Sequence, residues 1–129
     1  MHYNRATKAR VLLRMQFMAA LNDVDVLVSP TSPYPAPLHT ALTARFESAE
    51  DVRTRCFLRR AYTGCYSLTA LPSISIPGGF TRDGLPMGRQ LGARPFAKET
   101  PFRAAHAYEQ ATDWHTRIGP AAQAQTDRS

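Results

Sequence analysis

The stretch from Leu71 to Leu91 constrains the fold of this chain more than any other part of the sequence. It reads LPSISIPGGFTRDGLPMGRQL, two largely apolar runs joined by residues rich in Gly, Pro and Asp. Runs such as Leu71–Ile76 and Met87–Ala93, bounded by these turn residues, are typical of β-strands. Because the connection is too short for a helical crossover, the sequence predicts an antiparallel pair.

Three helices are predicted around this pair. The first, Tyr3–Leu21, contains neither Gly nor Pro and places apolar residues at helical spacings beside an arginine-rich face. The second, Glu47–Leu68, also carries an apolar stripe. The third has Thr100 as its N-cap, directly before a proline, and Gly119-Pro120 ends it.

A third strand and a rigid loop complete the pattern. Val24–Val28 (VDVLV) suits a strand buried on both faces of a parallel or mixed sheet. The four prolines of Ser29–His39 (SPTSPYPAPLH) exclude a helix or central strand, so this segment is an extended loop. The predicted class is α/β, a small mixed sheet of about three strands with about three covering helices. Residues 1–120 form one segment of a domain, and residues 121–129 are expected to be a disordered tail.

Composition narrows the class of protein and its partners. With 129 residues, 43% hydrophobic and 20% charged, the chain fits one globular domain. No apolar run is long enough to span a bilayer and no secretory segment is visible, so a cytoplasmic location without a membrane partner is expected. The net charge of +6 comes from scattered basic residues without interleaved aromatics, so a solvated surface is favoured over a nucleic-acid interface, and RNA binding through the arginine-rich faces is a weaker alternative.

The order of these pieces resembles the C-terminal portion of the amidase signature family. After the first helix come VDVLVSPTSPYPAP, a second helix, LPSISIPGGF, DGLPMGRQL, RPF and AHAYEQATDWH. The resemblance covers Tyr3 to Trp114. The family includes bacterial amidases and the A subunit of tRNA-dependent amidotransferases. It implies hydrolysis or transfer at an amide C–N bond and a large sheet covered by helices.

The groups that the resemblance implies for catalysis are not found in this sequence. The family uses a lysine, a serine in a cis peptide and a nucleophilic serine, with backbone N–H groups that bind the oxyanion. The last two residues belong to a Gly- and Ser-rich segment, whereas the one Gly-Gly pair here, Gly78-Gly79, ends a strand. Neither Lys8 nor Lys98 lies in a matching context. No catalytic residue is assigned.

By the same resemblance, Thr31, Arg60 and Thr63 match positions that border the substrate pocket. Hydroxyls and a cation there would orient a carboxamide or carboxylate. The alternative is that Thr31 caps a turn and Arg60 is a solvated helix residue. The chain also departs from the family, with Ala70 where Gly is usual and Arg89 where a leucine is usual. An arginine at an apolar strand position must pair, extend to the surface or face solvent.

Neither a metal nor another cofactor is predicted. The polar residues near the end of the chain lack the His-x-x-x-His spacing that places two imidazoles on one helix face: His106, Glu109, Asp113 and His115. Ser73 and Ser75 share one strand face and are interpreted as core hydroxyls, because neither lies at a nucleophile elbow.

The leading hypothesis is an amidase-family segment that is inactive alone, either a truncated gene product or a piece that completes a split enzyme. A small-molecule amide would be a substrate only of the complete enzyme. The alternative is a non-enzymatic module that self-associates or binds a complementing amidase segment. Strands cut from a larger sheet leave open edges and uncovered apolar faces, which favours such association.

Overall fold

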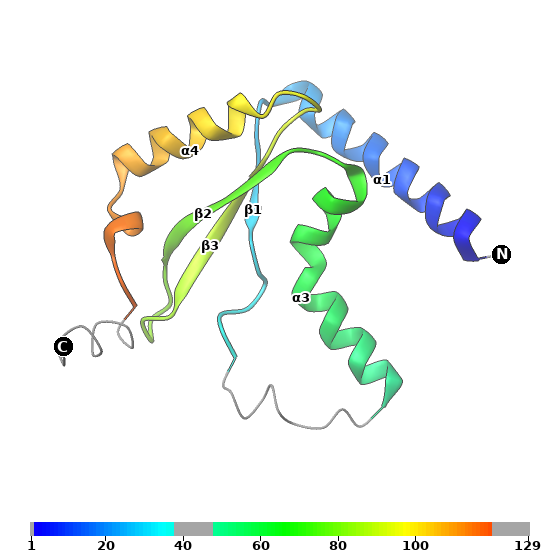
Figure 1. Ribbon diagram of the computed structural model, residues 1–129, viewed down its shortest axis with the longest axis horizontal. Helices are drawn as coiled ribbons and strands as arrows, with labels where there is room; N and C mark the ends of the chain where they lie inside the picture. Colours follow the sequence, from blue (N-terminus) through cyan, green and yellow to red (C-terminus); the bar gives the residue numbers. More distant parts are fainter. Residues whose placement is uncertain (1, 38–47, 120–129) are drawn as a thin grey trace.

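A three-stranded sheet lies at the centre of the structure, a computed structural model that describes residues 2–37 and 48–119. The strand order is β1–β3–β2, with β1 at Leu27–Pro30, β2 at Ser73–Phe80 and β3 at Pro86–Gly92 (Figure 1). The predicted three strands and the β2–β3 hairpin are confirmed. Both strand pairs are antiparallel, so the described strands lack the parallel pairing that a mixed sheet includes. The tail predicted for residues 121–129 lies outside the described residues.

A tight turn closes the β2–β3 hairpin. The amide of Thr81 donates to the carbonyl of Leu85 at 2.8 Å, and the amide of Gly84 donates to the carbonyl of Thr81 at 3.0 Å. Gly84 has a φ of 79°, a conformation that glycine adopts without a Cβ clash. The Asp83-Gly84 pair therefore makes the turn that the sequence predicts, and it fixes the register of β2 against β3.

Four helical segments surround the sheet within the described residues. They are α1 at His2–Asp23, α3 at Ala49–Thr69, α4 at Glu99–Ala111 and the short 3-10 helix η1 at Trp114–Thr116. The hydroxyl of Ser48 caps α3 by accepting the amide of Asp51 at 3.1 Å. In the part of the chain that the structure describes, no helix is long and apolar enough to cross a membrane.

The last helix differs from its prediction at both ends. The sequence predicts Thr100 as the N-cap, but α4 begins at Glu99, and the amide of Thr100 already donates to a carbonyl three residues earlier. The helix ends at Ala111 instead of continuing to the Gly-Pro pair. The backbone of Thr112 is extended, with φ −140° and ψ 163°, so Trp114 belongs to the separate turn η1.

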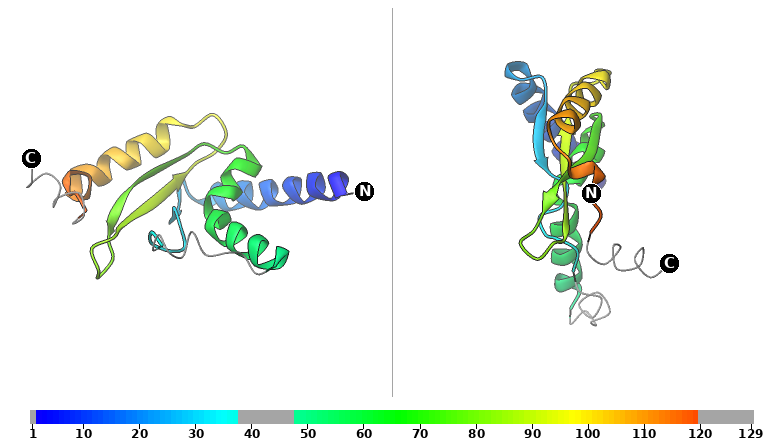
Figure 2. Two further views of the ribbon diagram at one scale, coloured as in Figure 1. Left: turned by 60° about the horizontal axis from the view of Figure 1, so that its bottom comes forward. Right: turned by 90° about the vertical axis from the view of Figure 1, so that its left-hand side faces the viewer.

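Helix α4 covers one face of the sheet. Ile76 of β2 and Leu91 of β3 are buried against Ala105 of α4, and the small side chain of Ala105 lets the helix lie close to the strands. Figure 2 shows α4 running alongside the β2–β3 hairpin. This half of the molecule has a closed core made from a sheet face and one helix.

A second core joins α1, α3 and the start of the β2 segment. Leu21, Tyr66 and Leu71 are buried together. Beyond this junction, α1 and α3 both extend away from the sheet (Figure 1). Apolar side chains on their outer parts are exposed, with Leu12 at 62% and Phe57 at 73%. The two helices therefore present apolar surface that the described residues do not cover.

Strand β1 is not buried on both faces, as its sequence predicts. Val28 is 62% exposed, and the burial of β1 alternates between half-buried and exposed positions. The main contacts of α4 are with β2 and β3, so the same face of β1 lies open. The apolar side chains of VDVLV are thus only partly buried by the described residues.

Candidate functional site

Polar residues occupy the face of the sheet opposite α4. In the strand register, Ser29 and Ser75 both stand opposite Gln90, one on each side of the central strand. Ser73 lies two residues before Ser75 on β2, opposite Gly92, and Thr31 follows directly after the end of β1. Because side chains alternate between the two faces of a sheet, these positions share one face. We call Ser29, Thr31, Ser73, Ser75 and Gln90 the polar row.

Gly88 of β3 lets the side chains of Thr31 and Ser75, which flank β3 on either side, come into contact. The Oγ1 of Thr31 and the Oγ of Ser75 are 2.5 Å apart, and either hydroxyl can donate. A Cβ at Gly88 would lie 2.8 Å from the Oγ1 of Thr31 and 3.2 Å from the Oγ of Ser75, so a larger residue would separate the hydroxyls. Ser73 and Ser75 are exposed, which corrects their interpretation as core hydroxyls. The buried side chains of β2 alternate with them on the α4 face.

The centre of the polar row is buried. Gln90 is 5% exposed, and its Nε2 donates to the Oγ of Ser73 at 3.1 Å. The Oε1 of Gln90 is buried without a hydrogen-bond partner among the described residues, whereas the buried Oγ of Ser29 interacts with the phenol of Tyr66. Because buried polar groups in proteins are generally paired, the Oε1 of Gln90 marks hydrogen-bonding capacity that the described side chains leave unused.

Tyr66 of α3 closes one end of this face. Its ring packs over Gly92, where a Cβ would overlap with the ring, and contacts Phe17 edge-on at 5.3 Å between centroids. Burial raises the pKa of the Tyr66 phenol above its usual value, and the interaction with the Ser29 hydroxyl partly offsets this rise. The opposite end of the row, at Thr31 and Ser75, opens to solvent.

The structure places the three predicted binding residues on two different elements. Thr31 belongs to the polar row, while Arg60 and Thr63 lie on α3, within two turns before Tyr66. Arg60 is exposed and Thr63 is half-buried. No hydrogen bond or ion pair between described residues joins Thr31 to either of them. Their role in substrate binding stays a prediction.

The polar row holds neutral groups only. Lys8 and Lys98 are both exposed, and neither hydrogen bonds to a serine among the described residues. A serine hydroxyl without an adjacent base is a weak nucleophile. Within residues 2–37 and 48–119, no three His, Cys, Asp or Glu side chains come together to hold a metal ion. The row can orient a neutral hydrogen-bonding group, but nothing in it activates a hydroxyl.

Sequence reasoning overlooked Gln90 and Gly88, although a signal for both was present. In β3 every second residue, namely Gly88, Gln90 and Gly92, is small or polar, while the larger side chains of Arg89 and Leu91 lie between them. This alternation indicates a strand with one face of large side chains and one face that accommodates neighbours closely.

A comparison with family models agrees with the resemblance read from the sequence. The model described as Amidase matches residues 1–100, which is most of the chain. The chain belongs to the amidase family.

Individual relatives give the same result. The chain is 43% identical over 116 residues to the glutamyl-tRNA(Gln) amidotransferase A subunit of Pseudomonas putida, in a match that covers 90% of this chain and 22% of the relative. It is 42% identical over 119 residues to the corresponding protein of Methanosarcina mazei, covering 92% of this chain and 23% of the relative.

Solved structures share the arrangement of elements. A crystal structure of the Thermotoga maritima glutamyl-tRNA(Gln) amidotransferase A subunit matches with a TM-score of 0.65 and 30% identity, over 78% of this chain and 20% of that one. A crystal structure of an amidase matches with a TM-score of 0.68 and 26% identity, over 84% and 24%. The chain thus spans about a fifth to a quarter of the length of its relatives.

Proposed function

We propose that this chain is the C-terminal portion of an amide-processing fold and forms one wall of its amide-binding cleft. In this proposal the chain does not hydrolyse or transfer amides by itself. The observation that carries it is a polar row of hydroxyl and amide groups, without a base, in a chain of the amidase family. The matched part is about a fifth to a quarter of each relative, which leaves room elsewhere for the catalytic groups.

The chemistry of the polar row suits a carboxamide. A carboxamide offers one acceptor oxygen and two N–H donors. The Thr31–Ser75 pair keeps one hydroxyl proton free to donate, because only one of the two hydroxyls donates within the pair. Both oxygens also retain lone pairs that accept N–H groups. In the proposal, Arg60 and Thr63 border the same cleft from α3.

The remainder of an amidase fold is the proposed partner of the uncovered surfaces. Leu12 and Met15 of α1 are 62% and 63% exposed, and Phe57 of α3 is 73% exposed. Exposed apolar patches of this kind mark interaction surfaces in soluble proteins. A complementing amidase segment, in the same polypeptide or a separate one, would bury them. A cytoplasmic location stays a prediction.

Ammonia release from primary amides tests the activity directly. The purified 129-residue chain is incubated with glutamine and with simple aliphatic amides, beside the variants Ser75→Ala and Thr31→Ala. We expect no turnover above the protein-free background. Turnover by the chain that either substitution abolishes would contradict the proposal.

Complementation tests the structural part of the proposal. The chain is produced together with an amidase-family protein that lacks the matching portion. We expect the two polypeptides to copurify and amide turnover to appear, with Thr31→Ala raising KM more than it lowers kcat. Separate elution of the two polypeptides, with no turnover from the mixture, would count against the proposal.

A second candidate function is a non-enzymatic module that self-associates. It is favoured by the sheet order, which leaves the outer edges of β1 and β2 without a neighbouring strand among the described residues. Size-exclusion chromatography with light scattering separates the two cases. Concentration-dependent dimers favour the module, and a compact monomer at all concentrations excludes it.

A further inference from the structure

A large cavity, half open to solvent, lies between the proline-rich loop after β1 and strand β3. Its volume is about 990 Å³, and the side chains that line it are mostly apolar, including Val28, Pro33, Tyr34 and Met87. Arg89 is the single charged side chain among the described residues that line it. The volume is that of a cavity for a small organic ligand.

Arg89 is held in a defined position at this cavity. Its guanidinium carbon lies 5.3 Å from the centroid of the Tyr108 ring, a cation–π contact with α4. Its aliphatic stem passes over Gly78, where a Cβ would come within 2.5 Å of the Cγ of Arg89. Stacking uses the flat face of the guanidinium and leaves its in-plane N–H donors free.

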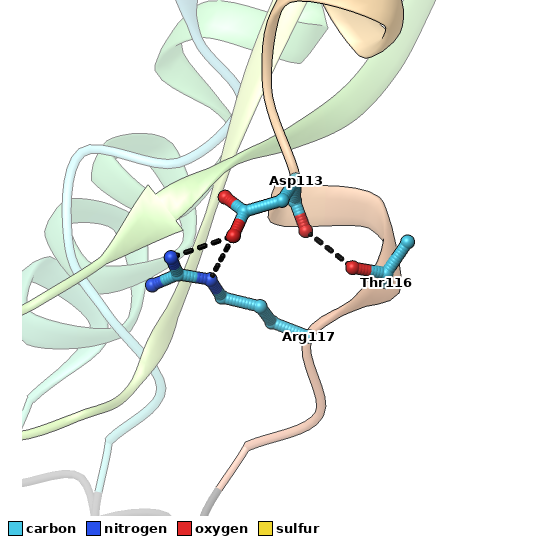
Figure 3. Close-up of polar contacts among 3 residues, drawn as sticks. All are labelled: Asp113, Thr116 and Arg117. Atoms are coloured by element: carbon cyan, nitrogen blue, oxygen red, sulfur yellow. Dashed lines mark hydrogen bonds and ion pairs between the residues drawn. The ribbon is translucent and has the colours of Figure 1, made fainter.

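Arg117 provides a comparison within the same protein, because it has both an aromatic ring contact and a carboxylate partner. It also stacks on an aromatic ring, 4.6 Å from the centroid of Trp114. Its Nε and Nη2 donate to the Oδ2 of Asp113 at 2.9 and 2.7 Å (Figure 3). These hydrogen bonds hold the pKa of Asp113 below its usual value. Arg89, in contrast, has no carboxylate partner among the described residues.

We propose that this cavity binds a small monocarboxylate with an apolar body. The carboxylate would sit on the free N–H edge of Arg89, and the body would pack against Pro33, Tyr34 and Met87. Arg89 is exposed and has no carboxylate partner among the described residues, and its guanidinium favours an anion over a neutral group because a charge-assisted hydrogen bond is stronger than a neutral one. The inference goes beyond the proposed amide-processing function, because Arg89 faces α4 and does not belong to the polar row, although Ser29 of that row also lines the cavity.

A matched pair of ligands tests the inference on the intact chain. Isothermal titration calorimetry compares 2-naphthoate with 2-naphthamide, which has the same ring system and no charge. We expect the carboxylate to bind about tenfold more tightly, the lower range for a hydrogen bond to a charged group. Equal affinities, or no binding of either probe, would overturn the inference.

Variants assign the preference to Arg89. In Arg89→Leu the two probes are expected to bind equally, while in Arg117→Leu the tenfold preference is expected to remain. Arg89→Lys keeps the charge but loses the planar fork, so a preference of only a few-fold is expected. Circular dichroism confirms that each variant is folded. A full preference that persists in Arg89→Leu and Arg89→Lys, or that disappears in Arg117→Leu, contradicts the inference.

Discussion

The two halves of this molecule bury their apolar side chains to different degrees. On the side of α4, Ile76, Leu91 and Ala105 are each no more than 6% exposed, and these buried residues come from one continuous stretch of sequence, with Val26 packed against them. On the side of α1 and α3, burial is confined to the junction around Leu21 and Tyr66. In the first half the sheet and α4 bury each other's apolar faces. In the second half the outer parts of α1 and α3 have exposed apolar side chains.

The difference has a physical basis in the length of chain available. A hairpin followed directly by a helix closes short loops, so its contacts cost little conformational entropy. The helices α1 and α3 each need a partner along their whole length, and they contact each other only near one end. In relatives four to five times as long as the matched part, additional chain is available as such a partner.

The largest expected effect is on the free energy of unfolding, when the same leucine-to-alanine substitution is made in each of the two halves. Leu91→Ala removes buried apolar volume under α4, and we expect the free energy of unfolding to fall by about 2–5 kcal/mol. Leu12→Ala makes the same chemical change on the exposed face of α1, and we expect a change within about 0.5 kcal/mol. Urea denaturation of both variants measures the contrast. Equal destabilisation by the two would show that the halves do not differ.

Substitutions of two glycines test how tightly the chain packs near the junction of the two halves. Gly92→Ala places a methyl group into the ring of Tyr66, and we expect a loss of about 1–3 kcal/mol in the free energy of unfolding. Gly64→Ala adds a methyl group on α3 that meets only the Cβ of Arg60, at 3.9 Å. There we expect a gain of up to about 1 kcal/mol from helix propensity. A destabilised Gly64→Ala together with a neutral Gly92→Ala would contradict this packing.

A smaller gain is expected where α3 ends. Ala70 has φ 53° and ψ 40°, and its amide donates to the carbonyl of Tyr66, so an alanine occupies the left-handed cap position. Ala70→Gly should raise the free energy of unfolding by about 0.5–1 kcal/mol, because glycine adopts this conformation without the Cβ clash. Thermal unfolding measures the change, with Ala49→Gly in the first turn of α3 as the control that should not stabilise.

The smallest effect is a dependence on alkaline pH. Burial raises the pKa of Tyr66 in the folded protein, whereas the phenol of the unfolded chain ionises near its usual value of 10.0. The stability from the neutral phenol is therefore full below about pH 10 and is lost as the pH rises towards the folded pKa. We expect the wild type to lose stability more steeply than Tyr66→Phe above about pH 10. Parallel slopes for the two proteins would show that Tyr66 does not contribute.

Local signals made much of the fold predictable. The Asp83-Gly84 turn and the flanking runs specify the hairpin, because turn geometry and strand alternation are encoded within a few residues. The unusual Ala70, noted against the glycine common in the family, coincides with the left-handed cap of α3. The strand boundaries were less accurate, and β1 begins at Leu27 rather than at Val24.

The polar row could not be predicted, because it depends on pairing between distant segments. Alternation alone shows that Ser73 and Ser75 share a face, but not which face the helix covers. The approach of Thr31 to Ser75 depends on the glycine at position 88 of a third segment. The position of Arg89 likewise depends on Gly78 and on the ring of Tyr108.

Amide hydrogen exchange of the intact chain tests the central contrast most directly. The free energy of local opening, measured residue by residue, should be highest in β3 and the adjoining face of β2, followed by α4. It should be lowest in the half of α1 before Leu13 and in the first turns of α3. We expect low protection there because the outer parts of these helices have exposed apolar faces among the described residues. Uniform protection along α1 and α3, equal to that of β3, would contradict this account.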